Sequence, residues 1–187
     1  MNKKIFITNG QGASGKDTFV NIIDKYMPVF KCSIIDIIKD AGEILGCDTS
    51  NVKTEKDRKF LSNLKDLVAE YNDLPYQDIK EIVDDFNDGY IEDCEALFID
   101  MRDPSDIKRA VKDFKAETIL IRNPRNKKID SNHADLKVEN YNYDYIIEDD
   151  GMIEQLEKVA KFFIRDVICN SSIPKEKRPF VMTCSKY

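Results

Sequence analysis

Residues 10 to 18, Gly-Gln-Gly-Ala-Ser-Gly-Lys-Asp-Thr, combine the residue types that bind phosphate groups. Gly10, Gly15 and Lys16 match the spacing G-x-x-x-x-G-K. Glycines let successive backbone N–H groups turn toward an anion, a helix that starts here adds partial positive charge, and the lysine reaches the outer phosphates. The residues predicted to bind the phosphates of a nucleotide such as ATP are Gly10, Gln11, Gly12, Ala13, Ser14, Gly15, Lys16, Asp17 and Thr18.

One position departs from the strict pattern, because Asp17 stands where a hydroxyl residue normally follows the lysine. The hydroxyl arrives one residue later, at Thr18, which is predicted to help hold Mg²⁺. The alternative is a glycine-rich turn with an incidental lysine. Residues 10 to 15 hold three glycines, a large share of the 7 in the chain, between a strand pattern and a helix pattern, which favours phosphate binding.

A second group of candidates follows an apolar run at residues 96 to 101, which closes in Asp100 and Arg102. An aspartate binds Mg²⁺ directly or through water, and an arginine holds a phosphate with its planar fork. Asp100 is therefore predicted as a second metal ligand and Arg102 as a catalytic residue that holds a phosphate. A strand-end ion pair or a helix-cap cluster is the alternative interpretation.

Basic residues elsewhere are weaker candidates. Arg122 and Arg125 flank Pro124, and Arg125 is predicted to stabilise charge on a transferred phosphate. Lys39 and Arg58 are candidates for binding an acceptor phosphate, although Lys and Arg usually lie on the solvated side of helices. The single histidine, His133, has no Cys or His partners that would make it a metal ligand.

Strand and helix patterns alternate along most of the chain, in an order that places these residues at one edge of a sheet. The order predicts a five-stranded parallel sheet with helices on both faces, and ligands bind such sheets beyond the carboxyl ends of the strands. The predicted strands are at residues 3–8, 29–32, 96–101, 118–122 and 145–148.

The predicted organisation is one domain over residues 1–169. It includes a helical insertion at about 47–90 that binds the second substrate and a lid loop at about 123–140 that lacks apolar periodicity. Residues 170–187, with Pro174 and Pro179, are predicted to be an irregular extension.

Composition narrows the class of protein. A net charge of −6 argues against a nucleic-acid polymer as partner. The 5 cysteines are scattered and odd in number, which fits a reduced, cytoplasmic protein without a disulfide framework. No apolar run has membrane-spanning length, so no membrane partner is expected. The oligomeric state stays open.

The sequence resembles a group of small-molecule P-loop kinases that includes phage-type deoxynucleoside monophosphate kinases and animal-type phosphomevalonate kinases. Gly15-Lys16-Asp17-Thr18 is similar to the end of their phosphate loop, in which Asp replaces the usual hydroxyl residue. Asp100-Met101-Arg102 resembles their Asp-x-Arg strand end. Residues 132–135 and 143–151 resemble a His-containing segment and the last strand with its turn.

The resemblance implies a nucleoside monophosphate kinase-like fold and a kinase that uses ATP and Mg²⁺. The implied donor contacts are those of the phosphate loop, with Arg102 on the acceptor phosphate and Arg125 in the lid. The acceptor would be a phosphorylated small molecule, with a nucleoside or deoxynucleoside monophosphate first. Phosphomevalonate and dephospho-coenzyme A are alternatives, and a non-catalytic nucleotide-binding sensor is an alternative from a different class.

Overall fold

The computed structural model describes residues 3–50, 54–124, 138, 140–149, 151–170, 173, 174, 176 and 178–183. The chain forms two compact units, which are described separately below. The first unit comprises Met1–Lys31 and Ile91–Tyr187, and the second comprises Cys32–Tyr90.

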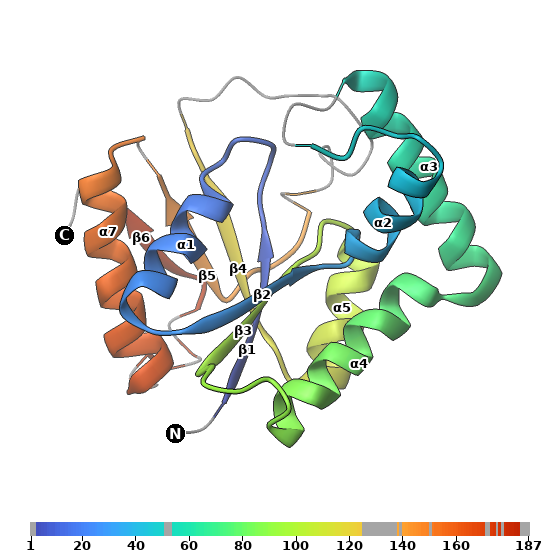
Figure 1. The fold of residues 1–187 in the computed structure, drawn as a ribbon. Helices are drawn as coiled ribbons and strands as arrows, with labels where there is room; N and C mark the ends of the chain where they lie inside the picture. The colour runs from blue at the N-terminus through green and yellow to red at the C-terminus, as the bar shows by residue number, and fades with distance from the viewer. Residues whose placement is uncertain are drawn as a thin grey trace. The chain divides into compact units, whose positions relative to one another are not determined.

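The sheet has six strands in the order β2-β3-β1-β4-β5-β6, one more than the sequence predicts (Figure 1). The pairs β1–β3, β1–β4, β4–β5 and β5–β6 are parallel. The strand bounds are β1 (Lys4–Asn9), β2 (Val29–Ser33), β3 (Ala96–Asp100), β4 (Glu117–Arg122), β5 (Tyr145–Glu148) and β6 (Phe180–Thr183). The five predicted strands are confirmed, and no strand end shifts by more than one residue.

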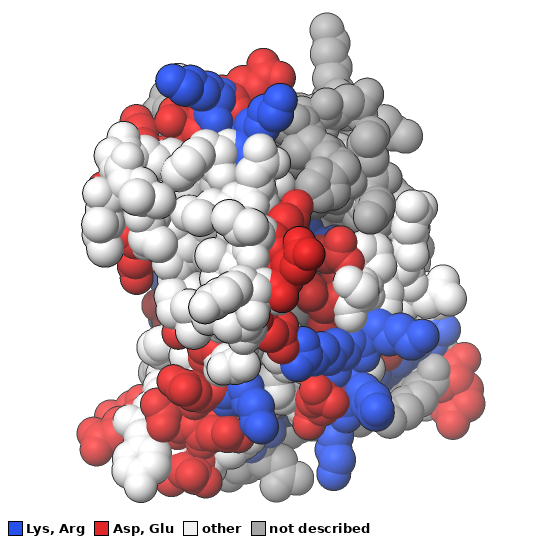
Figure 2. Space-filling view, turned by 90° about the vertical axis from the view of Figure 1, so that its right-hand side faces the viewer, with Lys and Arg blue, Asp and Glu red and all other residues white. Residues whose placement is uncertain are grey.

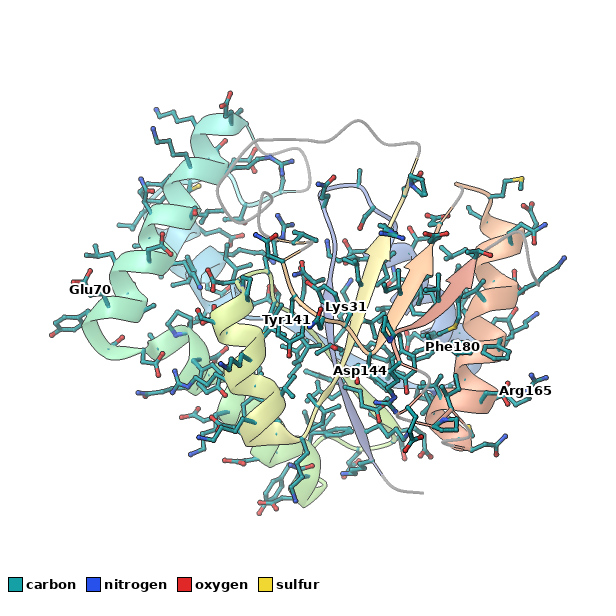
Figure 3. The ribbon with its side chains drawn as sticks, turned by 180° about the vertical axis from the view of Figure 1, so that it is seen from behind. Lys31, Glu70, Tyr141, Asp144, Arg165 and Phe180 are labelled. Carbon is teal, nitrogen blue, oxygen red and sulfur yellow. The ribbon has the colours of Figure 1, made fainter. Side chains whose placement is uncertain are left out.

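The additional strand, β6, lies in the segment that was predicted to be irregular. It pairs with β5 from Tyr145↔Phe180 to Glu148↔Thr183. Arg178 lies just before it and donates hydrogen bonds to Asp144 Oδ1 at 3.0 Å and Glu117 Oε1 at 2.9 Å. Figure 3 shows Asp144 and Phe180 near the starts of β5 and β6. A run of four residues after two prolines carries too little periodicity to predict a strand. In the folded protein, β6 forms because the edge of β5 supplies its backbone hydrogen-bond partners and the ion pairs of Arg178 hold the preceding residues in place.

Helices cover both faces of the sheet in the first unit. α1 (Lys16–Tyr26) and α7 (Ile153–Phe163) lie on one face and α5 (Pro104–Phe114) on the other (Figures 1 and 3). Between the sheet and α1 and α7, a core of fully buried side chains includes the stacked and edge-packed rings of Phe6, Phe19, Phe98 and Phe163. Asp103 caps α5 by accepting a hydrogen bond from Ser105 N, with Pro104 in the first turn.

A π-helical turn, η1 (Ile164–Cys169), continues α7. The side chain of Lys4 donates to the carbonyl oxygen of Val167 in this turn at 2.6 Å, so β1 and η1 are directly joined.

The second unit is helical. α2 (Asp36–Ile44), α3 (Glu55–Asn72) and α4 (Leu74–Asp88) pack against one another. A Cβ placed on Gly42 of α2 would lie only 2.7 Å from Leu61 Cδ2 of α3, so the absence of a side chain at Gly42 allows this close approach. Within the described part of the chain, no helix combines the length and the apolar content needed to cross a membrane.

Candidate phosphate-binding site

The predicted phosphate loop joins β1 to α1 in the first unit, at the carboxyl edge of the sheet. β1 ends at Asn9 and α1 begins at Lys16, with Gly15 as its N-cap in a left-handed conformation at φ 91°. The carbonyl oxygen of Gly15 accepts the first helical bond from Phe19 N at 2.8 Å. The N–H groups of a helix's first turn have no acceptor within the helix, so these groups and the helix dipole favour an anion at the start of α1.

Two of the loop glycines are required by close contacts. A Cβ on Gly10 would lie 2.2 Å from the carbonyl oxygen of Ile121, and a Cβ on Gly15 would lie 2.3 Å from Asp149 Oδ2. The contact at Gly10 is with backbone, so a larger residue there would force the loop away from β4. At Gly15 the Asp149 carboxylate could move, but the φ of 91° disfavours any residue with a side chain. The spacing of the glycines thus reflects how tightly the loop sits on the sheet edge.

Lys16 and Ser14 direct polar groups into the loop. Lys16 is only 8% exposed and its Nζ donates to the carbonyl oxygen of Gly10 at 3.1 Å. Ser14 is 3% exposed, and no described residue makes a hydrogen bond with its Oγ. That oxygen lies 2.5 Å from the position of a Cβ on Gly10. The loop therefore holds a buried ammonium and a buried hydroxyl that can both donate to a phosphate oxygen.

An open depression of about 380 Å³ lies against the loop. Its lining comprises residues Ala13 to Thr18 with Asn123, Asp149 and Gly151. Asp149 is 6% exposed, and its Oδ1 accepts from Gly151 N at 2.8 Å. Because the depression extends from the phosphate loop to the segment after β5, it can hold a group attached to the phosphates.

The buried side chain of Asn9 joins the phosphate loop to the loop after β3. Its Oδ1 accepts from Gly10 N at 2.7 Å, and its Nδ2 donates to Tyr143 OH at 2.7 Å and to the carbonyl oxygen of Arg102 at 3.3 Å. Tyr143 OH in turn donates to the carbonyl oxygen of Val138 at 2.7 Å. Three separate chain segments are thereby held in register around the site.

The metal candidates lie on the same edge of the sheet. Asp100 ends β3 and is paired in register with Thr8, two residues before Gly10. Thr18 lies in the first turn of α1 with its side chain exposed. Asp17 is directed elsewhere, because its carboxylate pairs with the ammonium of Lys31.

The remaining candidates are distributed over other parts of the chain. Arg102 is half-buried in the first unit, whereas Lys39 and the exposed Arg58 belong to the second unit. Lys39 Nζ already pairs with Asp36 Oδ1 at 2.5 Å. A joint acceptor site of Arg102, Lys39 and Arg58 stays a prediction.

Of the two arginines that flank Pro124, only Arg122 belongs to the described residues, and it ends β4. Arg122 NH2 donates to Glu148 Oε1 at 2.6 Å, which joins the ends of β4 and β5 by an ion pair. Arg125 lies outside the described residues, as does most of the predicted lid at 123–140.

Sequence reasoning did not select Asn9, Asn123, Asp149 or Gly151 as site residues. Each of these residues ends a strand or follows one at the carboxyl edge of the sheet, where ligands bind in open α/β sheets. Selecting every polar residue and glycine just after a predicted strand would have identified them. What the sequence pattern lacks is the pairing of β4 with β1 and β5, which brings residues 123 and 149 to the phosphate loop.

A parallel sheet covered on both faces, with a glycine-rich loop between its first strand and first helix, is the architecture of P-loop α/β proteins. No protein-family model matches the chain, and no curated protein sequence matches it.

Solved structures of two kinases share the fold. An unliganded sugar kinase from a Janibacter species is 10% identical with a TM-score of 0.51, over 91% of this chain and 98% of that one. Dephospho-CoA kinase from Campylobacter jejuni is 15% identical with a TM-score of 0.51, over 91% of this chain and 100% of that one. At these identities the likeness establishes the common fold.

Proposed function

We propose that this protein is an ATP-dependent kinase that transfers the γ-phosphoryl group to a phosphorylated small molecule. A nucleoside or deoxynucleoside monophosphate is the first candidate acceptor. The observation that carries the proposal is the loop itself, in which a buried lysine and a buried hydroxyl converge at the start of α1. The kinase neighbours of the same fold support it.

The proposed chemistry depends on positioning and charge, since phosphoryl transfer needs little covalent help from the protein. Backbone N–H groups of residues 10–15 would bind the donor phosphates. Lys16 would exchange its bond to Gly10 O for the outer phosphate oxygens, where it neutralises developing charge. Arg102 would fix the acceptor phosphate and Arg125 would approach the transferred group.

The residues at the site fit Mg²⁺, which would neutralise charge on the phosphate oxygens when bound. Thr18 supplies a hydroxyl and Asp100 a carboxylate, and magnesium prefers such oxygen ligands. Among the described residues, no cluster of three or more His, Cys, Asp or Glu side chains could hold a metal ion by itself.

The proposal is tested by ADP formation in a coupled assay with ATP, Mg²⁺ and a panel of acceptors. The panel contains the nucleoside and deoxynucleoside monophosphates, phosphomevalonate and dephospho-coenzyme A. The last is included because a neighbour of the same fold is described as dephospho-CoA kinase.

Lys16→Ala should abolish ADP formation, and Lys108→Ala, an exposed lysine on α5, should leave it unchanged. If no acceptor raises the rate above background hydrolysis while ATP still stabilises the protein, the kinase proposal fails and the sensor alternative is favoured. A second ligand that adds to the stabilisation by ATP supports a two-substrate site.

A further inference from the structure

Helix α3 of the second unit exposes a row of large apolar side chains. Phe60 is 39% exposed, Leu67 is 64% exposed and Tyr71 is 87% exposed. Leu61, by contrast, is 2% exposed and packs close to Gly42 of α2. The buried face of α3 therefore starts at Leu61, and the exposed row lies beside it rather than within the unit.

The row has the spacing of a helix-pairing seam. Phe60, the half-buried Leu64, Leu67 and Tyr71 are separated by four, three and four residues, so all four lie within about 40° of one line along the helix. The series is symmetric about the midpoint between Lys65 and Asp66. An antiparallel copy of the same helix would place Phe60 against Tyr71 and Leu64 against Leu67, and each layer would occur twice.

The charges beside this row are arranged for the same pairing. Lys56 and Lys59 lie in the N-terminal half of α3 and Asp66 and Glu70 in the C-terminal half, all on one flank of the row. Figure 3 shows Glu70 on the C-terminal half of the helix. In the antiparallel arrangement, Lys59 lies about 3 Å along the axis from the position opposite Glu70 of the other copy. Basic ends would thus meet acidic ends.

Figure 2 shows, on the face that it draws, a broad uncharged area with basic side chains above it. The helix itself is well defined, because Thr54 and Asp57 form a reciprocal capping box at its start. On an exposed helix face, charged and polar side chains are usual, and a contiguous row of exposed apolar side chains often marks an interaction site.

We propose that this row is a self-association surface, on which α3 of one chain pairs antiparallel with α3 of a second copy. The inference does not depend on the proposed kinase activity. One helix per copy gives an interface at or below the roughly 1,200 Å² of standard complexes, so the dimer is expected to form in the micromolar range.

The test is sedimentation velocity on the full chain over about 1 to 300 µM, a span that covers micromolar dissociation constants. The expected result is a reversible monomer–dimer equilibrium. Leu67→Lys places a charge in two layers of the interface and should weaken dimerisation at least about tenfold, which corresponds to 1.4 kcal/mol. Ile44→Lys on α2, 87% exposed and outside the row, is the matched control and should change it less than about twofold.

A charge reversal separates pairing from general surface effects. Lys59→Glu and Glu70→Lys should each weaken the dimer, and the double variant should recover most of the loss because the ion pair is restored with its direction reversed. Circular dichroism confirms that each variant is folded. A chain that stays monomeric over the whole range overturns the proposal, and so does a dimer that survives Leu67→Lys or a double variant weaker than both single ones.

Discussion

The buried hydroxyl of Ser14 predicts that Ser14→Ala raises the stability of the ligand-free protein and lowers its affinity for a phosphate ligand. Ser14 Oγ is buried and lacks a hydrogen-bond partner among the described residues. An unsatisfied buried polar group costs about 1–3 kcal/mol. Ser14→Ala should therefore raise the free energy of unfolding of the ligand-free protein by about 1 kcal/mol, or the Tm by about 2–4 °C at this chain length.

The same substitution should weaken the binding of a phosphate ligand. A hydrogen bond to a charged group contributes about 1.5–3 kcal/mol. Losing it would reduce affinity for MgATP by about ten- to a hundredfold, since each 1.4 kcal/mol is a factor of ten. The stabilisation by a fixed MgATP concentration should shrink accordingly, so the Ala variant is more stable without ligand and gains less with it.

Thermal unfolding with and without MgATP measures both effects. The matched control is Thr118→Val, at the far end of β4 from the site. Thr118 is also a buried hydroxyl, but its Oγ1 donates to Asp144 Oδ2 at 2.9 Å and accepts from Asp144 N at 2.9 Å. Its loss should lower stability by about 1–3 kcal/mol and leave the ligand-induced shift unchanged. A Ser14→Ala protein that is less stable without ligand and unchanged in its MgATP shift would refute the reasoning.

Three further predictions concern stability. Arg178→Ala should lower the free energy of unfolding, measured in urea titrations, by about 2 kcal/mol. This is less than the usual 3–5 kcal/mol for breaking a buried ion pair, because Glu117 and Asp144 keep other hydrogen-bond donors. The control Arg109→Ala removes an exposed ion pair and should cost less than about 0.5 kcal/mol, so equal losses would contradict the role of Arg178 in anchoring β6. Burial and the hydrogen bond to Glu117 raise the pKa of Tyr145. The neutral phenol therefore contributes fully to the free energy of unfolding below about pH 10, and this contribution falls by about 1.4 kcal/mol per pH unit above it. Tyr145→Phe should remove this decrease in stability at alkaline pH, and an unchanged decrease would contradict the prediction. Burial, followed by the neighbouring carboxylates of Glu81, Asp36 and Asp40, raises the pKa of Asp78 above its ordinary 3.8. The protonated carboxyl therefore favours the folded state at low pH, and this contribution is lost as pH rises. Asp78→Asn should stabilise the protein by about 0.3 kcal/mol at pH 7 but not at pH 3, whereas Asp84→Asn, on the exposed side of α4, should not show this difference.

Local patterns in the sequence predicted the elements that carry the site. Asp103 and Pro104 start α5, Gly89 ends α4 in a left-handed conformation, and the strand from Lys4 breaks into the glycine-rich loop. Each of these signals depends on residues within one or two turns of each other. These signals can therefore be recognised in the sequence without knowing the tertiary structure.

The row on α3 illustrates where the pattern is ambiguous. The apolar positions from Phe60 to Tyr71 predict an amphipathic helix, and the helix is confirmed. The periodicity cannot distinguish Leu61, which is buried, from Leu67 and Tyr71, which are exposed. The choice depends on where Gly42 allows α2 to approach, and that is a contact between helices.

The sequence by itself determined where the glycine-rich connection between β1 and α1 lies, because Gly10, Gly15 and Lys16 stand close together in the chain between a strand pattern and a helix pattern. Only the tertiary structure decided that Asp149 packs on Gly15, that Asn9 holds the loop of Arg102, and that the tail forms β6. These contacts join segments from about 35 to more than 130 residues apart. They arise from strand order and register, which are set by the packing of the whole sheet and leave no local periodicity in the chain.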